Sequence, residues 1–381
     1  MLTTSIDTEK LLATFLEMVR IDSPSGAEEK MRAYLEERLV SMGLETRVDA
    51  GGNLFCDIPG EQCTHDSLLV VSGHMDVVPP CLGVQPMVTG SGMDRVITSD
   101  NTTVLGADDK SALAVIIEGL AVSIAEKRPR PPIRLILTTR EEVVLAGAKE
   151  IDVSELDGKF SVIFDHTGEQ GIIITEAPSF YELNVHFRGK SVHAGIMPEK
   201  GVNALVYASK VIDAWRQAGL LGRVDADTTT NIGTLKGGKG TNVVPDHLHL
   251  WGELRGHNQE TLERVMAEMK VILEDQKTEM PGADYELLIT EAFTMFKMDE
   301  SHPGVQRVAA AAEQTGLTPQ FIRTNGGSDN NVFVNKGLPG VVLSAGYIAP
   351  HSLKESILLK DLTVCGEFYM NIMNAFAETS F

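Results

Sequence analysis

The stretch VVSGHMDVVPP, residues 70–80, decides how this chain is interpreted. It continues an apolar run that begins at Leu68, and it ends that run with His74 and Asp76. An imidazole and a carboxylate at the end of a buried strand are costly unless they bind a cation or each other. One explanation is that the strand ends at a metal site, which directs the search for ligands to the ends of other buried strands.

Three further apolar runs read as buried strands, and each is followed or ended by polar groups. They are IRLILTT (133–139), FSVIFDH (160–166) and GVVLSAG (340–346). Continuous apolar strands are typical of sheets that are covered on both faces and at least partly parallel. Because helical segments alternate with these strands, we predict an α/β fold with a layered, mixed sheet.

Helical patterns precede and separate these strands. Residues 8–20 carry apolar side chains at helical spacing. Ser25 and Glu28 have the spacing of a capping box, which predicts a second helix that ends at Gly43. Residues 110–126 are apolar almost all round, as expected of a helix packed between other layers.

The pattern changes near residue 178 and changes back near residue 293. FYELNVHFRG (180–189) alternates strictly, so we expect a strand with one exposed face. The elements that follow have the β-α-β-β-α-β order of a ferredoxin-like α+β domain. We predict a discontinuous larger domain, residues 1–177 and 293–381, interrupted by a lid domain, residues 178–292. The one-sided sheet of the lid offers an edge for a homodimer.

Composition narrows the class of protein. The chain has 381 residues, with 43% hydrophobic and 23% charged residues, which is ordinary for a globular protein. A formal net charge of -20 argues against nucleic acid and anionic membrane as partners. There is neither a run of 18 apolar residues nor a basic segment typical of a signal peptide, so we expect a cytoplasmic protein.

The cysteines also favour a cytoplasmic protein. The four cysteines lack the spacing of a zinc knuckle, so any metal ligands should be His, Asp and Glu. Free thiols in a reducing cytoplasm are the favoured state. Pairing among Cys56, Cys63 and Cys81 is the alternative that the sequence leaves open.

Acidic and imidazole side chains recur where the buried strands of the larger domain end. They are His74, Asp76, Asp108, Asp109, Glu141, Glu142, Asp165 and His351. The carboxyl edge of a parallel sheet is where α/β proteins place their sites. Histidine and carboxylate donors without cysteine suit Zn²⁺, Co²⁺ or Mn²⁺. The set can supply a bridging carboxylate and terminal ligands for two ions, and one carboxylate of the Glu141–Glu142 pair remains as a general base.

These segments resemble a known family. GHMDVVP, NTTVLGADDK, TTREEVV, IFDHTGEQG, SVHAG, TNVVPD, GELRGHN, GGSDNN and PHSLKESI occur in the order found in cocatalytic dizinc exopeptidases. That group contains peptidase T, carboxypeptidase G and the aminoacylases. The resemblance runs from about residue 8 to 375, and the TTVLGADDK and GGSDNN stretches look most like peptidase T, an aminotripeptidase.

The resemblance implies a role for each matching residue of the larger domain. His74 and Asp165 would be terminal ligands of one metal ion, Glu142 and His351 would bind the other, and Asp108 would bridge the two. Asp76 would hold the second ring nitrogen of His74. Glu141 would be the general base that takes a proton from the attacking water and passes it to the leaving amine.

In the lid, the resemblance implies contacts with the substrate. His193 of SVHAG matches a residue that, in dimeric relatives, reaches the active site of the partner and polarises the scissile carbonyl. Asn242 and Arg255 match positions that contact the substrate, Arg255 through a terminal carboxylate. Gly326, Gly327 and Ser328 match a loop that lines the substrate cleft.

Simpler explanations exist for several of these residues. Asp109 could cap the following helix, and Glu141 and Glu142 could be solvated charges in the first turn of a helix. His193 could be structural, and Arg255 could form an ion pair within the lid. Two departures from peptidase T bear on the substrate: this chain is shorter, and it has Val77 where Thr follows the His-x-Asp motif.

Together these observations predict a metallopeptidase: a metal-dependent exopeptidase that acts on short peptides, with an aminotripeptidase as the leading hypothesis. Two divalent ions, Zn²⁺ with Co²⁺ or Mn²⁺ as alternatives, would be its cofactors. An N-acyl amino acid hydrolase or a carboxypeptidase on the same site is the alternative. A non-catalytic peptide-binding protein would have lost ligands or the base, and all of them are present here.

Overall fold

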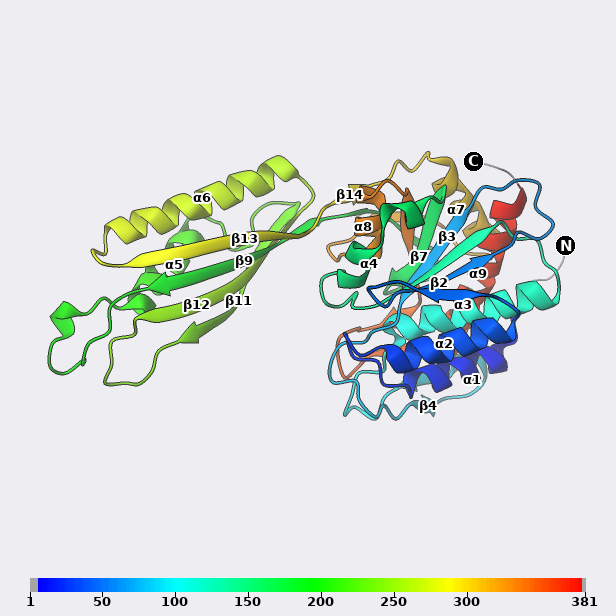
Figure 1. Cartoon of the computed structure of the whole chain (residues 1–381), viewed down its shortest axis with the longest axis horizontal. Helices are drawn as coiled ribbons and strands as arrows, with labels where there is room; N and C mark the ends of the chain where they lie inside the picture. The colour runs from blue at the N-terminus through cyan, green and yellow to red at the C-terminus, as the bar shows by residue number, and fades with distance from the viewer. Residues whose placement is uncertain (1–5, 379–381) are drawn as a thin grey trace. The chain divides into compact units, whose positions relative to one another are not determined.

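The computed structural model describes residues 6–378 and divides into two compact units (Figure 1). Unit 1 contains residues 6–176, Phe296–Thr324 and 328–378. Unit 2 contains Ala177–Met295 and Asn325–Gly327.

Unit 1 is built on a nine-stranded mixed sheet in the order β1-β2-β6-β3-β7-β16-β8-β14, with β15 paired to β8. Its strands are β1 (Thr46–Val48), β2 (Leu54–Ile58), β3 (Leu69–His74), β6 (Ile133–Thr138), β7 (Phe160–His166), β8 (Ile172–Ala177), β14 (Phe296–Lys297), β15 (Gln320–Arg323) and β16 (Gly340–Ser344). The central strands β6, β3, β7 and β16 are mutually parallel. Every residue of β3 and β16 is buried, so both faces of the central sheet are covered. The predicted α/β fold is confirmed.

The helices of unit 1 supply that cover (Figure 1). They are α1 (Thr8–Val19), α2 (Glu29–Ser41), α3 (Ala107–Ala125), α4 (Ala146–Glu150), α7 (Pro303–Gln314), α8 (Asp329–Asn335) and α9 (Leu359–Glu378). Helix α3 packs against β3 and β7 and also contacts α1 and α9. Because it lies between these elements, its residues from Ala107 to Leu120 are all buried, as the all-round apolar pattern predicts.

A second, smaller sheet of unit 1 has the order β17-β18-β5-β4. Its strands are β4 (Met87–Thr89), β5 (Val96–Thr98), β17 (Tyr347–Ile348) and β18 (Ser356–Leu358). The sheet matters for function because His351 lies in the connection between β17 and β18.

The predicted capping box at Ser25 is wrong. Helix α2 begins at Glu29 and has no side-chain cap. The Ser25 hydroxyl donates instead to Asp76 Oδ2 at 2.7 Å. The Glu28 carboxylate accepts from the backbone N–H of Gly26 and of Arg140. Each side chain therefore contacts a distant segment, and Glu28 also holds its own turn, instead of the two forming a capping box.

Unit 2 is an α+β sandwich with ferredoxin-like topology, as predicted. Its elements are β9 (Ser179–Arg188), α5 (Ala204–Gln217), β10 (Gly222–Arg223), β11 (Thr228–Gly237), β12 (His247–Gly256), α6 (Gln259–Thr278) and β13 (Asp284–Phe293). The sheet has the order β10-β11-β12-β9-β13, and all its strand pairs are antiparallel. Helices α5 and α6 pack on one face, where alternate side chains such as Val185 and Leu250 form the core.

Two further observations bear on the expected environment. None of the helices within residues 6–378 combines the length and the apolar character that crossing a membrane requires. All four cysteines are free thiols, which excludes the alternative of a pair among the first three in this structure.

Candidate metal centre

The parallel register of the central strands brings the predicted residues to one edge of the sheet. His74, the last residue of β3, is aligned with Thr138, the last residue of β6. Glu141 and Glu142 come three and four residues after Thr138, and Asp165 is the penultimate residue of the neighbouring strand β7. Because these strands point the same way, their carboxyl ends place three acidic groups around the His74 ring.

Asp108 lies between two imidazole rings. Its Oδ1 is 3.1 Å from His74 Nε2, and its Oδ2 is 3.4 Å from His351 Nε2. His351 Nε2 is also 2.9 Å from Glu142 Oε1, and His74 Nε2 is 3.7 Å from Asp165 Oδ1. One oxygen of Asp108 therefore lies beside His74 and Asp165, and the other lies beside His351 and Glu142. This is the arrangement that a bridging ligand requires.

Three groups of side chains could each hold a metal ion, since their ligand atoms lie within 4.8 Å of one another. The groups are His74–Asp108–Asp165, His74–Glu141–Glu142 and Asp108–Glu142–His351. The structure thus brings together all five residues predicted to be metal ligands, and it places Glu141 beside them. The first and third groups share only Asp108.

The donor set fits divalent cations. Six carboxylates surround two imidazoles in a mostly buried site: Asp76, Asp108, Asp109, Glu141, Glu142 and Asp165. Asp109 Oδ1 is buried and has no hydrogen-bond partner among the described residues. Burying several carboxylates without enough positive charge is unfavourable, and divalent ions would supply that charge.

The pKa values of the carboxylates reflect the same excess of buried negative charge. Burial raises the pKa of Asp165 to about 7, although the neighbouring His74 works against this. Burial and the charge of Asp165 also raise the pKa of Glu141 well above its ordinary value. In contrast, contacts with His351 and His74 outweigh burial and hold the pKa of Asp108 below its usual range. The carboxylate between the two rings is thus the one that stays charged most readily.

Asp76 does more than the expected contact with His74. The closest acceptor to His74 Nδ1 is the main-chain oxygen of Asp76 at 3.0 Å, with the carboxylate Oδ1 at 3.4 Å. The carboxylate accepts from the backbone N–H of Glu141 at 2.9 Å and of Glu142 at 3.2 Å. Ser25 donates to it as well. Asp76 therefore orients the histidine and fixes the backbone that carries both glutamates.

Of two further residues at the site, Glu355 was not singled out by the sequence, and Asp109 was considered only as a helix cap, a role for which α3 shows no side-chain hydrogen bond. Glu355 accepts from the backbone N–H groups of Leu105, Gly106 and Asp108 at 2.8, 2.8 and 2.9 Å, and so holds the loop that presents Asp108. Asp109 Oδ2 accepts from His74 N at 3.1 Å, where a side chain in place of Gly73 would collide with it. These contacts join segments far apart in the chain, so no local pattern signals them.

Two more buried groups complete the surroundings. Tyr347 places its hydroxyl 3.3 Å from Asp165 Oδ1. Asp329, the first residue of α8, accepts from Thr138 Oγ1 at 2.5 Å, and its other carboxylate oxygen has no partner among the described residues. Burial raises the pKa of Asp329 to about 6. The GGSDNN stretch therefore contributes a buried acid, a possibility that the sequence interpretation had not considered.

The residues predicted to contact the substrate belong to unit 2, apart from Ser328, which caps α8 in unit 1. His193 and Asn242 lie on adjacent loops: His193 forms a β-bridge with Val243, and Ala194 N donates to Asn242 O at 2.9 Å. His193 Nδ1 accepts from Gly195 N at 3.2 Å, so its other ring nitrogen is left for further contacts.

Arg255 has partners within the lid. Its guanidinium lies 3.2 Å from Glu253 Oε2, donates to Asn325 O at 3.3 Å and stacks over the Phe180 ring at 4.4 Å. The ion pair that the sequence left as an alternative is thus present. Gly326 and Gly327 continue the same segment, and Phe293 occupies the space that a side chain at Gly327 would need.

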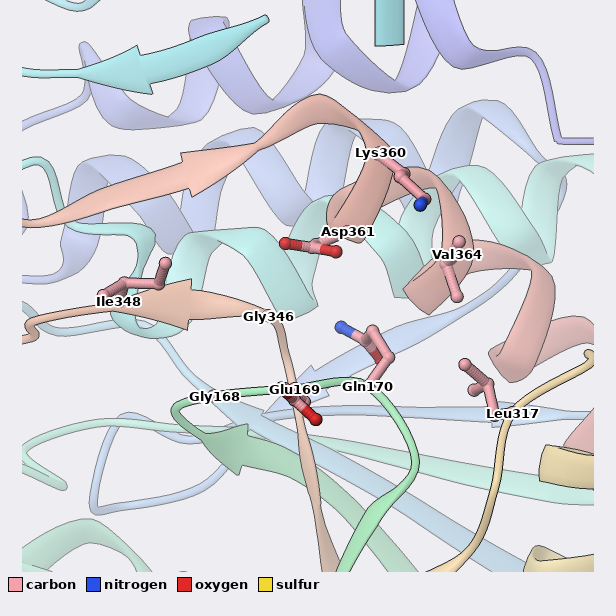
Figure 2. Close-up of a pocket in the computed structure, with 9 residues that line it drawn as sticks. All are labelled: Gly168, Glu169, Gln170, Leu317, Gly346, Ile348, Lys360, Asp361 and Val364. Carbon is pink, nitrogen blue, oxygen red and sulfur yellow. The ribbon is translucent and has the colours of Figure 1, made fainter. Parts of the chain in front are cut away.

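A separate cavity of unit 1 has a volume of about 460 Å³ (Figure 2). Its lining includes Gln170, Leu317, Asp361 and Val364, and Figure 2 shows Gln170 and Asp361 extending toward each other across it. No residue predicted for the metal centre or for substrate binding lines this cavity.

Each of the two units contains a segment that matches the model of a known protein family. Residues 53–167 match the model of peptidase family M28, and residues 177–281 match the peptidase dimerisation domain of the M20 peptidases. The uncharacterized protein YqjE of Bacillus subtilis is 33% identical, over 98% of this chain and 100% of its own length.

Two solved structures are similar over the whole chain. One is aminopeptidase PepT from Bacillus cereus, with 34% identity, a TM-score of 0.85, and coverage of 98% of this chain and 100% of its own. The other is a tripeptidase from Staphylococcus aureus, with 32% identity, a TM-score of 0.91, and coverage of 99% and 100%.

The fold, the shared carboxylate and these similarities define a metallopeptidase. The chain belongs to the cocatalytic dizinc exopeptidase family, within which it is like peptidase T.

Proposed function

We propose that this metallopeptidase is an aminopeptidase that releases the N-terminal residue of tripeptides and other short peptides. The observation that carries the proposal is the Asp108 carboxylate, which faces His74 with one oxygen and His351 with the other. Beside it lies Glu141, whose carboxylate has no hydrogen-bond partner among the described residues and is available to react. The similar structures named an aminopeptidase and a tripeptidase support the substrate class.

In this proposal His74 and Asp165 would hold one divalent cation, Glu142 and His351 would hold the other, and Asp108 would serve both. Zinc is the proposed metal, with Co²⁺ and Mn²⁺ as alternatives, because all the donors are imidazole or carboxylate. When bound, such cations polarise the scissile carbonyl and lower the pKa of the attacking water.

Side chains of this protein transfer a proton from the attacking water to the leaving amine. Glu141 accepts the proton of the attacking water on its carboxylate and delivers it to the nitrogen of the leaving amine. Asp76 keeps Glu141 in position through the backbone N–H at 2.9 Å and also orients the ring of His74. The contact with Glu141 depends on the carboxylate of Asp76, whereas the His74 ring is held by the main-chain oxygen of Asp76 as well as by the carboxylate.

The lid residues are proposed to bind the substrate. His193 would polarise the peptide carbonyl from a partner lid in a homodimer, which the match to a peptidase dimerisation domain supports. Arg255 would bind a terminal carboxylate, and Asn242 would contact the peptide backbone. Gly326, Gly327 and Ser328 would line the cleft. The four free thiols support a cytoplasmic location for the reaction.

The test compares three forms of one tripeptide: free, N-acetylated, and amidated at the C-terminus. The protein is loaded with Zn²⁺, Co²⁺ or Mn²⁺ and assayed again after chelation. We expect hydrolysis of the free peptide, slower hydrolysis of the amidated form because Arg255 loses its carboxylate partner, no hydrolysis of the acetylated form, and loss of activity with chelator. Preference for the acetylated form would make the protein an acylase, and cleavage that requires the free carboxylate but not the amine would make it a carboxypeptidase.

A further inference from the structure

Three histidines of unit 2 gather on one face of its sheet. His186 lies in β9, and His247 and His249 lie in β12. Their neighbours Val185 and Leu248 belong to the core beneath α5 and α6. Because side chains alternate along a strand, the three histidines point to the opposite, solvent-facing side of the sheet. None of them belongs to the catalytic set.

The cluster has a defined geometry. His186 Nδ1 lies 3.1 Å from His247 Nε2. The His186 ring stacks on His249 with centroids 3.8 Å apart, and His249 in turn lies 3.4 Å from the ring of Trp251. His249 Nε2 is 3.2 Å from Asn184 Oδ1, so this ring is held from two sides. The stack braces His186 while its Nδ1 faces His247.

The separation of those two nitrogens suits a shared metal ion. Two imidazole nitrogens, each about 2.0–2.1 Å from one ion, are separated by about 2.8–3.4 Å for ligand angles between square-planar and tetrahedral. The observed distance of 3.1 Å lies within that interval. We propose that His186 and His247 chelate a late first-row divalent ion, with Cu²⁺ bound more tightly than Zn²⁺, at a site distinct from the catalytic centre.

The charges around the pair permit a cation. Glu286 of β13 is aligned with His186, and Arg188 is aligned with His247. Arg188 and Glu286 form an ion pair with each other, which largely cancels their charges. Lys236 lies over the Trp251 ring, with its nitrogen 5.6 Å from the centroid. Water would complete the coordination, since the face is open to solvent.

Without an ion, the same distance allows one N–H···N hydrogen bond between neutral rings. Protonation of both rings would break that bond and place two positive charges side by side. An ion therefore competes with protons for the pair, and binding should weaken in acid. Bound metal would also connect β9 and β12 through their side chains.

The experiment titrates the Zn²⁺-loaded protein with Cu²⁺ and measures bound Cu²⁺ and retained Zn²⁺ by elemental analysis. The EPR spectrum of the bound Cu²⁺ reports the number of nitrogen ligands. We expect one Cu²⁺ beyond the retained Zn²⁺, with two imidazole ligands. The variants His186→Gln and His247→Gln should each bind this Cu²⁺ at least about tenfold more weakly.

His257→Gln is the matched control, because this histidine follows β12 in the same unit but does not contact the pair. It should bind Cu²⁺ like the unaltered protein. The replaced side chains lie outside the core, and the melting temperature of each variant verifies that the lid is folded. Three results would overturn the proposal: no additional Cu²⁺, Cu²⁺ that enters only as Zn²⁺ leaves, or unchanged binding when both histidines are replaced.

Discussion

Unit 1 contains buried acidic groups in two clusters of polar side chains, and the clusters differ in how the acidic charge is balanced. The first surrounds Glu118 of α3, which is only 1% exposed. Its carboxylate accepts from Thr14 Oγ1 at 2.7 Å, lies 3.0 Å from Lys10 Nζ and forms an ion pair with Arg38. These partners outweigh burial and lower the pKa of Glu118. The chain's own cations therefore keep this acid charged, and it joins α1 and α2 to α3.

Within residues 6–378, no Lys or Arg forms an ion pair with the second cluster, at the carboxyl edge of the sheet. Its carboxylates meet two imidazoles, and burial raises the pKa values of Asp165 and Glu141. The difference teaches how to separate structural acids from functional ones. A buried carboxylate that is fully paired contributes to stability, whereas several that share too little positive charge indicate a place for added cations. Each prediction below tests one side of this contrast.

The largest effect is expected for Glu141→Gln. A glutamine cannot take up the proton of the attacking water, so kcat should fall by about 10²–10⁴-fold. The metal content should stay unchanged, because Glu141 is proposed as the base and not as a ligand. Steady-state kinetics and elemental analysis of the same preparation measure both quantities. Glu45→Gln, at an exposed position just before β1, is the control. Full activity in a Glu141→Gln protein with both metal ions would exclude the proposed base.

The next effect concerns Asp76→Asn, which keeps the size of the side chain and removes its charge. The amide cannot accept from Ser25, Glu141 and Glu142 as the carboxylate does, and it orients His74 less well. Loss of such an orienting carboxylate costs about 10–100-fold in metal affinity. Competition with a chelating indicator measures that affinity. Asp66→Asn, on the surface, should show none of this effect. An unchanged metal affinity in Asp76→Asn would mean that the backbone alone positions the ligands.

The sequence predicted the ligand residues at the carboxyl ends of the strands better than the residues that support them. Apolar runs that end in His74, Glu141 and Asp165 identify parallel strands with ligands at their carboxyl ends, because strand direction and side-chain chemistry are both local. The structure brings those residues together. Their roles stay proposals until the variants are measured.

What the sequence missed depends on contacts between distant segments. Ser25 and Glu28 match a local capping pattern, yet they contact Asp76 and Arg140 instead. Glu355 contacts the loop before Asp108 about 250 positions earlier, which no periodicity can signal. A helix cap contributes only about 1 kcal/mol to stability, so contacts with distant segments can determine where such a polar side chain forms its hydrogen bonds.

A smaller effect, and one on stability alone, is expected for Glu118→Gln. The change removes the charge that Lys10 and Arg38 share, although both cations retain access to water. We expect a loss of about 1–3 kcal/mol in the free energy of unfolding, measured with urea, and an unchanged kcat. Glu37→Gln on the exposed face of α2 should change the free energy by less than about 0.5 kcal/mol. A clear fall in kcat would show that the two acidic clusters are coupled.

The smallest effect is the pH dependence of that loss. The folded protein holds the pKa of Glu118 below its ordinary value of 4.5, so the charged form favours folding. This contribution is complete above the ordinary pKa and disappears as the pH falls through the lower, folded value. The difference in unfolding free energy between the unaltered protein and Glu118→Gln should therefore be constant from about pH 7 to 5 and shrink below about pH 4. Both proteins are compared after chelation, so that the loss of metal in acid affects neither. A difference that grew in acid would mean that Glu118 is protonated more readily in the folded protein than in the unfolded chain. The cluster would then resemble the unbalanced acids of the metal centre.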